Sequence, residues 1–314
     1  MGKLAGQRLI QLLWVLLFLS VVTFTLMKLA PGDPVRSILK PDEFLVTEAD
    51  MAELREELGL NEAVVVQYGA WLWKVLQLDL GNSHLTGKPV WDLIMSRLTV
   101  TLQLTAGALL VMLLITFPLG MAAARYTGRW PDHISRLLAI VGASIPNFWL
   151  GLILMYWFAY KLQLLPSTGI GTLEHMILPS IALGFSFAVV YARILRTGLL
   201  ESLSQDYILA ARARGVPERT IWLRYALRAA LQPVVTLFGL NIGTLLGGAV
   251  VIETMFGWPG LGSMVVSAIF GRDYPVIQGF VLFSGFVVVV INFCVDLIYR
   301  WIDPRIRLGK EEVL

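Results

Sequence analysis

Residues 100–124 read VTLQLTAGALLVMLLITFPLGMAAA and contain no Asp, Glu, Lys or Arg. A helix needs about 20 mostly apolar residues to cross the hydrocarbon core of a bilayer, because each residue adds only about 1.5 Å. The stretch also lacks the alternating polarity of a membrane barrel strand. Since only helices and closed barrels satisfy their backbone groups within lipid, we expect a membrane-spanning helix here.

Five further stretches have the same character, so we expect six spans in all. They lie at about residues 9–30, 137–160, 177–197, 231–254 and 276–299. The composition agrees, because 57% of the 314 residues are hydrophobic and only 15% are charged, against about 25% in soluble domains. The predicted fold class is therefore an all-α integral membrane protein. Pro118 and Pro146 lie inside two of the spans and are expected to kink them.

The distribution of basic residues predicts the orientation. Sixteen of the 25 lie at the two termini and in the connections after the second and fourth spans. Because Lys and Arg gather on the cytoplasmic side, we expect these segments and both termini to be cytoplasmic. The first span follows Lys3 and Arg8 and is not followed by a small-x-small cleavage site, so it is interpreted as an uncleaved signal anchor.

The chain then divides into four segments. These are the N-terminus with the first span (1–30), an extracytoplasmic segment (31–99), a five-helix core (100–302) with a cytoplasmic connection at 199–230, and a cytoplasmic tail (303–314). Two amphipathic helices are expected in the extracytoplasmic segment. One begins at an N-cap formed by Thr47 and Asp50 and stops at Gly59, and the other covers residues 62–78.

The connection between the fourth and fifth spans is predicted to form an elbow. Residues 204–214 favour a short helix, and Gly215 is a suitable residue to end it because glycine tolerates positive φ. Pro217 suits the first turn of a second helix. Such an elbow would project a compact knob into the cytoplasm. The alternative is a basic connector that only sets the topology.

The elbow also resembles a known family. Ala210, Ala211 and Gly215, followed by Pro233, are similar to the Glu-Ala-Ala-x-x-x-Gly coupling loop of ABC importer permeases, although Leu209 replaces the usual Glu. Other matching segments are residues 31–34, 67–68, 78–83, 256–262, 272–278 and 303–305. On these motifs together, the chain resembles the first permease subunit of nickel, dipeptide and oligopeptide importers.

The resemblance implies a type I permease fold in the bacterial inner membrane and a loop that docks on an ATPase. The residues that correspond to this loop are Asp206, Tyr207, Ala210, Ala211, Arg212, Arg214, Gly215 and Pro217. It further implies a second homologous permease, two ABC ATPase subunits that hold ATP and Mg, and a substrate-binding protein. This chain would then be no enzyme and would hold no cofactor. The cargo would be a nickel or metal chelate or a di- or oligopeptide, with a slight preference for nickel from residues 268–278.

Several residues within or beside the spans are candidates for the transport pathway. Polar residues are costly in lipid and usually face the protein interior, and small residues four apart allow helices to approach closely. The pathway or packing candidates are Asn147, Asn241, Glu253, Gly239, Gly243 and Gly247, and the candidates for an outer gate are Phe256, Trp258 and Pro259. Packing within this subunit is the alternative for the glycines, and a structural cap is the alternative for the gate.

Other classes of function find less support in the sequence. His84, His133 and His175 lie in three different connections, and no metal-ligand cluster accompanies them. There is no G-x-x-x-x-G-K-[ST] phosphate loop, so ATP must bind to another chain. The net charge of +3 does not suggest nucleic acid. An ion-coupled secondary transporter or channel remains the main alternative, although the spans hold few titratable residues and no pair of broken helices in corresponding halves.

Overall fold

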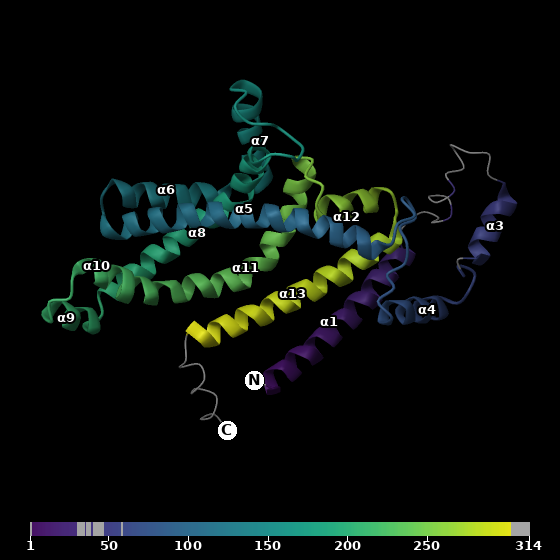
Figure 1. The fold of residues 1–314 in the computed structure, drawn as a ribbon, viewed down its shortest axis with the longest axis horizontal. Coiled ribbons are helices and arrows are strands. Elements are labelled where there is room, and N and C mark those ends of the chain that lie inside the picture. Colours follow the sequence, from purple (N-terminus) through teal and green to yellow (C-terminus); the bar gives the residue numbers. More distant parts are fainter. Residues whose placement is uncertain (1, 30–34, 36–38, 40–46, 58, 303–314) are drawn as a thin grey trace. The chain divides into compact units, whose positions relative to one another are not determined.

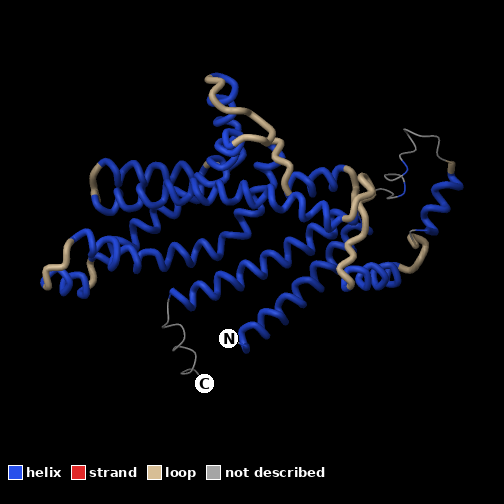
Figure 2. The backbone as a smooth tube through the Cα atoms, viewed as in Figure 1, coloured by secondary structure: helices blue, strands red, loops and turns tan. Residues whose placement is uncertain are grey.

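The computed structural model describes residues 2–29, 35, 39, 47–57 and 59–302, apart from some side chains within helices. The predicted motifs at 31–34 and 303–305 lie outside these residues, as does the tail. The described part is helical, with a single isolated bridge between Asn82 and Pro89 (Figures 1 and 2). The all-α fold class is therefore confirmed.

The helices follow one another along the chain in this order (Figure 1). They are α1 (Gly2–Leu29), α3 (Glu48–Glu57), α4 (Val64–Leu76), α5 (Val90–Arg125), α6 (Trp130–Ser144), α7 (Asn147–Leu154), the π-helix η1 (Met155–Lys161), α8 (Leu173–Leu203), α9 (Asp206–Ala213), α10 (Glu218–Thr220), the π-helix η2 (Ile221–Ala226), α11 (Leu227–Met255), α12 (Leu261–Phe270) and α13 (Tyr274–Ile302). Both helices predicted within residues 47–78 are present as α3 and α4, whereas α12 was not predicted.

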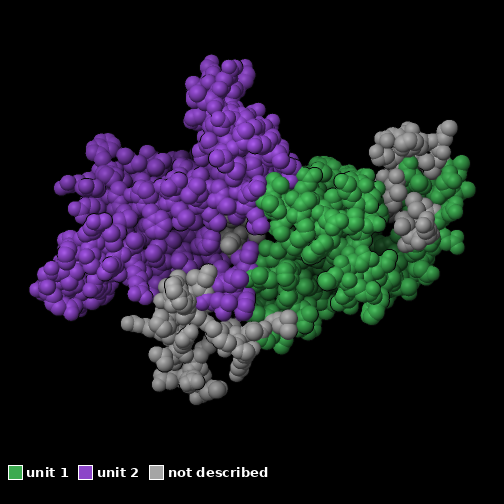
Figure 3. All heavy atoms as spheres, viewed as in Figure 1, with its two compact units in different colours: residues 1–100, 260–290 green, residues 101–259, 291–314 purple. Residues whose placement is uncertain are grey.

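The chain divides into two compact units (Figure 3). Unit 1 comprises residues 1–100 and 260–290, and unit 2 comprises residues 101–259 and 291–314.

Within the described residues, four helices are long and apolar enough to cross a membrane, and a bent pair would make a fifth span. The four lie at 10–29, 90–125, 173–203 and 274–295, and the bent pair consists of α6 and α7 with η1. Helix α11 occupies the predicted fifth span and is 29 residues long, but several of its side chains lie outside the described set. The count of six stays a prediction and is consistent with these helices.

The third predicted span is not a continuous helix. Helices α6 and α7 meet at Ile145 and Pro146 with a bend of 106°, so the kink predicted at Pro146 is present as a break between two helices. Pro146 has no N–H to continue the helix, and Ile145 takes the extended backbone that the residue before proline prefers (φ −91°, ψ 121°). A proline at this position therefore ends one helix and begins another.

Unit 2 is built around α8, which packs against α6, α7 and α11. The close approach of α8 to α5 depends on Gly184, where an added Cβ would lie only 2.4 Å from the carbonyl oxygen of Ala108. Leu195 and Leu199 of α8 are fully buried in the same unit. This packing holds the helices that lead into the elbow between α8 and α11.

In unit 1, α4 lies against α1. The hydroxyl groups of Ser20 and Tyr68 are 2.9 Å apart, and the ring of Phe24 packs against those of Tyr68 and Trp71 at 5.3 and 5.7 Å. Before α3, the backbone N–H of Thr47 donates to the carboxylate of Asp50 at 2.8 Å. The predicted N-cap is therefore correct.

Asp273, just before α13, holds the loop that precedes α5. Its buried carboxylate accepts hydrogen bonds from the hydroxyl of Ser83 at 2.5 Å and from the backbone N–H groups of His84 and Leu85 at 3.0 and 3.4 Å. Two sequence motifs that resemble the permease family, 78–83 and 272–278, thus meet in one hydrogen-bonded centre.

Replacing Asp273 with alanine is expected to destabilise this loop by about 2–4 kcal/mol, because a buried donor that loses its acceptor costs about 1–3 kcal/mol. Hydrogen exchange of the intact protein in lipid nanodiscs should be faster in peptides that cover residues 83–90. The Ser83→Ala variant loses only one of the three hydrogen bonds and should show a smaller increase. Equal hydrogen exchange of residues 83–90 in the wild type and in Asp273→Ala would contradict the role of Asp273 in holding this loop.

Candidate functional site

The predicted elbow is present between α8 and α11, and its turn has a defined geometry. Helix α9 is followed by Gly215, which has φ +76°. The N–H of Gly215 donates to the carbonyl of Arg212 at 2.9 Å, and the N–H of Val216 donates to the carbonyl of Ala211 at 3.1 Å. These two bonds form a Schellman motif, so glycine is needed at this position for its left-handed backbone. Pro217 then lies at the N-cap of α10, one residue before the predicted position.

The inner face of the elbow has a small apolar core. Ile208, Ala211 and Ile221 are fully buried and pack together, with Leu203 and Val216 against them. The hydroxyl of Tyr207 lies 2.5 Å from that of Ser202 in α8, which fixes the start of α9 to the preceding helix. The elbow is therefore a folded knob rather than a loose connector.

An ion pair closes the elbow on its other side. Arg212 Nε lies 2.7 Å from Glu218 Oε1, so α9 and α10 are linked across the turn. The hydrogen bond from Arg212 lowers the pKa of Glu218, and the same bond raises the pKa of the guanidinium. Both side chains are largely exposed, so this pair orients the helices more than it stabilises them.

The outer face of α9 exposes small and apolar groups beside charged ones. Leu209 is 71% exposed, and Ala210, Asp206 and Arg214 are also exposed. The two predicted alanines thus have different roles, because Ala211 packs inside the elbow while Ala210 faces outward. An exposed leucine beside a small residue gives another protein a surface for close contact, and the neighbouring charges can fix its orientation.

The pathway candidates are distributed over unit 2. Asn147 begins α7, directly after the bend, and its Oδ1 accepts a hydrogen bond from Ser186 of α8 at 2.7 Å. These two residues lie in the wall of an otherwise apolar cavity of about 380 Å³. The side chain of Asn241 lies outside the described set.

The three glycines of α11 do not behave alike. Gly239 is buried, whereas an added Cβ at Gly243 or Gly247 would meet no described atom within 4 Å. The last two therefore do not serve packing among the described residues of this chain.

Glu253 is fully buried in unit 2 and does not reach water. Its Oε1 accepts a hydrogen bond from Thr101 of α5 at 2.6 Å. This arrangement favours a packing role for Glu253 over a role in the pathway.

The predicted gate residues form a tight turn after α11. The N–H of Trp258 donates to the carbonyl of Glu253 at 2.7 Å, and the carbonyl of Phe256 accepts from the N–H of Gly169 at 2.9 Å. Phe256 and Trp258 are both 2% exposed, and Pro259 is partly buried. This geometry favours the cap that the sequence left open as the alternative to a gate.

One group of charges was missed from the sequence. Asp132, near the start of α6, is fully buried and lies 2.6 Å from both Arg136 and Arg196. Its Oδ2 also accepts the N–H of Gly128 at 2.9 Å. The spacing of Asp132 and Arg136 is a visible i, i+4 signal, but nothing in the sequence pairs Asp132 with Arg196 of α8. Among the described residues, no group of three His, Cys, Asp or Glu side chains could hold a metal ion.

Comparison with known proteins gives matches over nearly the whole chain. Residues 116–308 match the family described as "Binding-protein-dependent transport system inner membrane component", and residues 1–105 match its N-terminal counterpart. The glutathione transport system permease protein GsiC of Salmonella typhimurium is 42% identical over 304 residues, which cover 96% of this chain and 97% of GsiC. The probable D,D-dipeptide transport system permease protein DdpB of Escherichia coli is 40% identical over 335 residues, with 98% of each chain covered.

A solved structure is also similar. An inward-facing form of the MetNI methionine ABC transporter contains a chain that aligns with a TM-score of 0.55 and 21% identity. The alignment covers 67% of this chain and 96% of that one. At this identity the similarity concerns the fold alone.

Proposed function

Because the chain belongs to the family of binding-protein-dependent transport system inner membrane components, we propose that it is one of two permease subunits of an ABC importer for short peptides. The relatives named above are permeases of glutathione and dipeptide systems, which supports the peptide alternative. The preference for nickel stays an untested prediction. Partner ATPases and a substrate-binding protein follow from the family in general.

The observation that carries the proposal is the elbow around Gly215. We take its exposed face, with Leu209 and Ala210, as the surface that docks on a partner ATPase. The Schellman turn and the Arg212–Glu218 pair hold α9 against α10. ATP and Mg would bind to the two ATPase subunits, and closure of these subunits would move the elbow and reorient the spans. The permease itself would then perform no chemistry.

The orientation proposed for the chain places the elbow and both termini in the cytoplasm. The α8–α11 connection carries many of the arginines that favour this side. The cavity beside Asn147 and Ser186 is a candidate for part of the pathway, because broken helices and polar groups within membranes commonly line such cavities.

Gly243 and Gly247 are proposed to face the second permease. Since no described atom lies within 4 Å of an added Cβ at Gly243, a Gly243→Leu variant should fold normally. A leucine would nevertheless hold a partner helix away from α11, so we expect recovery of the second permease in pull-downs to fall at least about tenfold. The Gly6→Leu variant is the matched control, because Gly6 is equally open. Wild-type recovery with Gly243→Leu would contradict this contact.

The proposal as a whole is tested by purifying the tagged chain from native membranes in mild detergent and identifying the proteins that accompany it. A second permease and ABC ATPases should be recovered. The same complex in proteoliposomes, with its binding protein, should take up labelled peptides only when ATP is present. Transport by the chain alone after ATP depletion would overturn the proposal and favour an ion-coupled transporter.

A further inference from the structure

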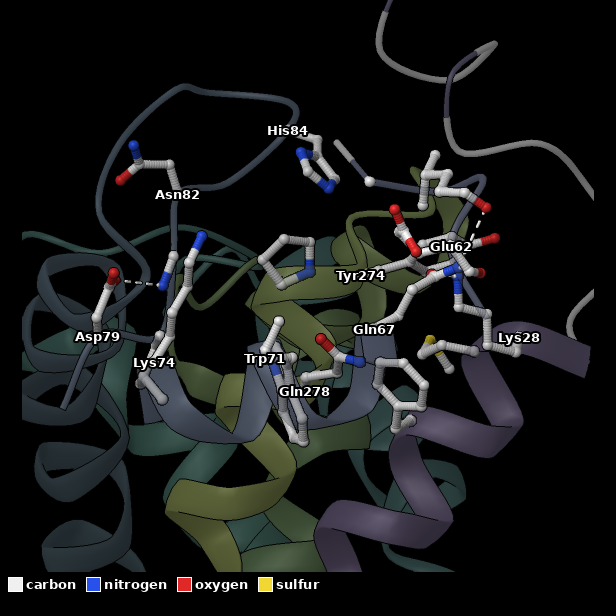
Figure 4. A pocket seen from close by; sticks show the side chains of 18 of the residues that line it. Lys28, Glu62, Gln67, Trp71, Lys74, Asp79, Asn82, His84, Tyr274 and Gln278 are labelled. Carbon is white, nitrogen blue, oxygen red and sulfur yellow. Dashed lines mark hydrogen bonds between the residues drawn. The ribbon is translucent and has the colours of Figure 1, made fainter. Parts of the chain in front are cut away.

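Unit 1 contains a cavity of about 580 Å³. Its walls come from the C-terminal end of α1, from residues 59–62 before α4, from α4 itself, from the loop at residues 79–84 and from the start of α13 (Figure 4). Small-molecule sites typically occupy about 300–1,000 Å³. The cavity is therefore large enough for a ligand of a few amino acid residues.

This cavity is separate from the one beside Asn147 in unit 2, because all the residues that line it belong to unit 1. None of the sites predicted from the sequence uses it. The chemistry of its walls must therefore indicate what it could bind.

Two polar groups at this cavity lack partners. Gln278 of α13 lines the cavity and is only 7% exposed, and no described residue hydrogen-bonds to its side-chain amide. Tyr274, one turn earlier, also lines the cavity, and its buried hydroxyl has no hydrogen-bond partner among the described residues. Buried polar groups are nearly always hydrogen-bonded, so the amide of Gln278 is available to a polar ligand.

The amide of Gln278 restricts the chemistry of that ligand. A side-chain amide offers N–H donors and a carbonyl acceptor side by side. A peptide bond presents the complementary acceptor and donor. A phosphate group presents only acceptors to this amide, so phosphate alone would leave the carbonyl of Gln278 without a partner.

Opposite charges lie on both sides of this amide. Figure 4 shows Lys74 and Asp79 on one side of Gln278 and Trp71, with Lys28 and Glu62 on the other. Lys28 donates to the side chain of Gln67, whereas no described residue pairs with the ammonium of Lys74 or the carboxylate of Glu62. Among the described residues, the unpaired ammonium of Lys74 and the unpaired carboxylate of Glu62 thus lie on opposite sides of Gln278 (Figure 4).

The remaining walls are apolar or neutral. The rings of Trp71 and Phe24 pack 5.7 Å apart and provide a flat surface for aliphatic or aromatic groups. Burial lowers the pKa of His84 below its usual value of 6.5, and the nearby Asp273 opposes this shift. The shift thus favours the neutral imidazole.

We propose that this cavity binds a short zwitterionic peptide, with its carboxylate at Lys74, its ammonium group at Glu62 and a peptide bond against Gln278. The inference rests on the peptide specificity proposed above, and it adds a peptide site within unit 1 of the permease itself. An anionic lipid headgroup carries no ammonium group for Glu62 and would place an anion beside it, which disfavours that occupant.

The test measures binding of radiolabelled trialanine to the complete complex in nanodiscs, without the substrate-binding protein. Lys74→Gln and Gln278→Met should each weaken binding at least about tenfold, because each removes hydrogen bonds to the ligand, one of them charge-assisted. Lys88→Gln is the matched control, since Lys88 is an exposed lysine of the same unit that does not line the cavity. Trialanine amide should bind the wild type weakly, and the loss of Lys74 should not weaken its binding further.

The outcomes separate this inference from the proposed function. The cavity site alone is overturned if the full system takes up peptides with ATP but the complex does not bind trialanine. The same conclusion follows if the system takes up peptides and all variants still bind trialanine. Absence of uptake for every peptide tested overturns the proposed function. The cavity would be assigned to a lipid instead if the wild-type complex binds no trialanine and co-purifies with phosphatidylglycerol that the Lys74→Gln complex lacks. Because Lys74 is exposed, its variant tests the site even if Gln278→Met fails to fold.

Discussion

Replacing Ala210 with tryptophan is expected to abolish peptide uptake while leaving the chain folded. Ala210 lies on the exposed face of α9, so a large ring there does not disturb the apolar core formed by Ile208, Ala211 and Ile221. It would instead hold the docking partner away from the elbow. We expect uptake in proteoliposomes, and the stimulation of ATP hydrolysis by the binding protein, to fall at least about tenfold, as for a central interface residue.

Ala52→Trp is the matched control, because Ala52 is also exposed but lies in α3 of unit 1. It should transport at the wild-type rate. Ala211→Trp should also lose peptide uptake but for another reason, because Ala211 is fully buried and a tryptophan there would disrupt the fold of the elbow itself. Normal uptake by Ala210→Trp would mean that this face of α9 does not dock on an ATPase.

The second large effect is expected at Asp132. Its carboxylate is fully buried between Arg136 and Arg196, and only the second of these arginines is itself largely buried, at 17% exposure. An Asp132→Ala variant leaves Arg196 without its counter-ion, and breaking a buried pair in this way typically costs about 3–5 kcal/mol. The midpoint of thermal unfolding should fall by about 6 °C or more, as judged by size-exclusion chromatography of heated samples.

Arg136 provides the control within the same cluster. Its side chain is 52% exposed, and exposed pairs contribute at most about 1 kcal/mol. Arg136→Ala should therefore shift the midpoint by no more than a few degrees. If Asp132→Ala and Arg136→Ala lowered the midpoint of thermal unfolding equally, the link between α6 and α8 would not depend on Arg196.

The sequence predicted the parts of this fold that depend on local patterns. The apolar stretches placed the long helices, Thr47 and Asp50 placed the start of α3, and Gly215 placed the end of α9. Each of these features depends on residues within a few positions of one another. Pro146 likewise gave the position of the break between α6 and α7, but the size of the bend depends on packing against α8, which the sequence does not display.

Contacts between distant segments could not be predicted in this way. The pairing of Asp132 with Arg196 and that of Thr101 with Glu253 join helices that are far apart in the sequence. The sequence left a gate and a cap open for Phe256 and Trp258, because the turn at Gly169 that contacts Phe256 belongs to another connection. Ala210 and Ala211 are adjacent and identical, and only the packing of the elbow distinguishes their roles.

The hydrogen bond between Ser83 and Asp273 has a consequence for the biosynthesis of the protein, because the two residues are 190 positions apart. At a translation rate of about 5–20 residues per second, roughly 10–40 s separate their synthesis. During that interval the loop before α5 lacks the carboxylate of Asp273. The three hydrogen bonds that this carboxylate accepts can therefore form only after the chain has been made as far as the start of the last helix.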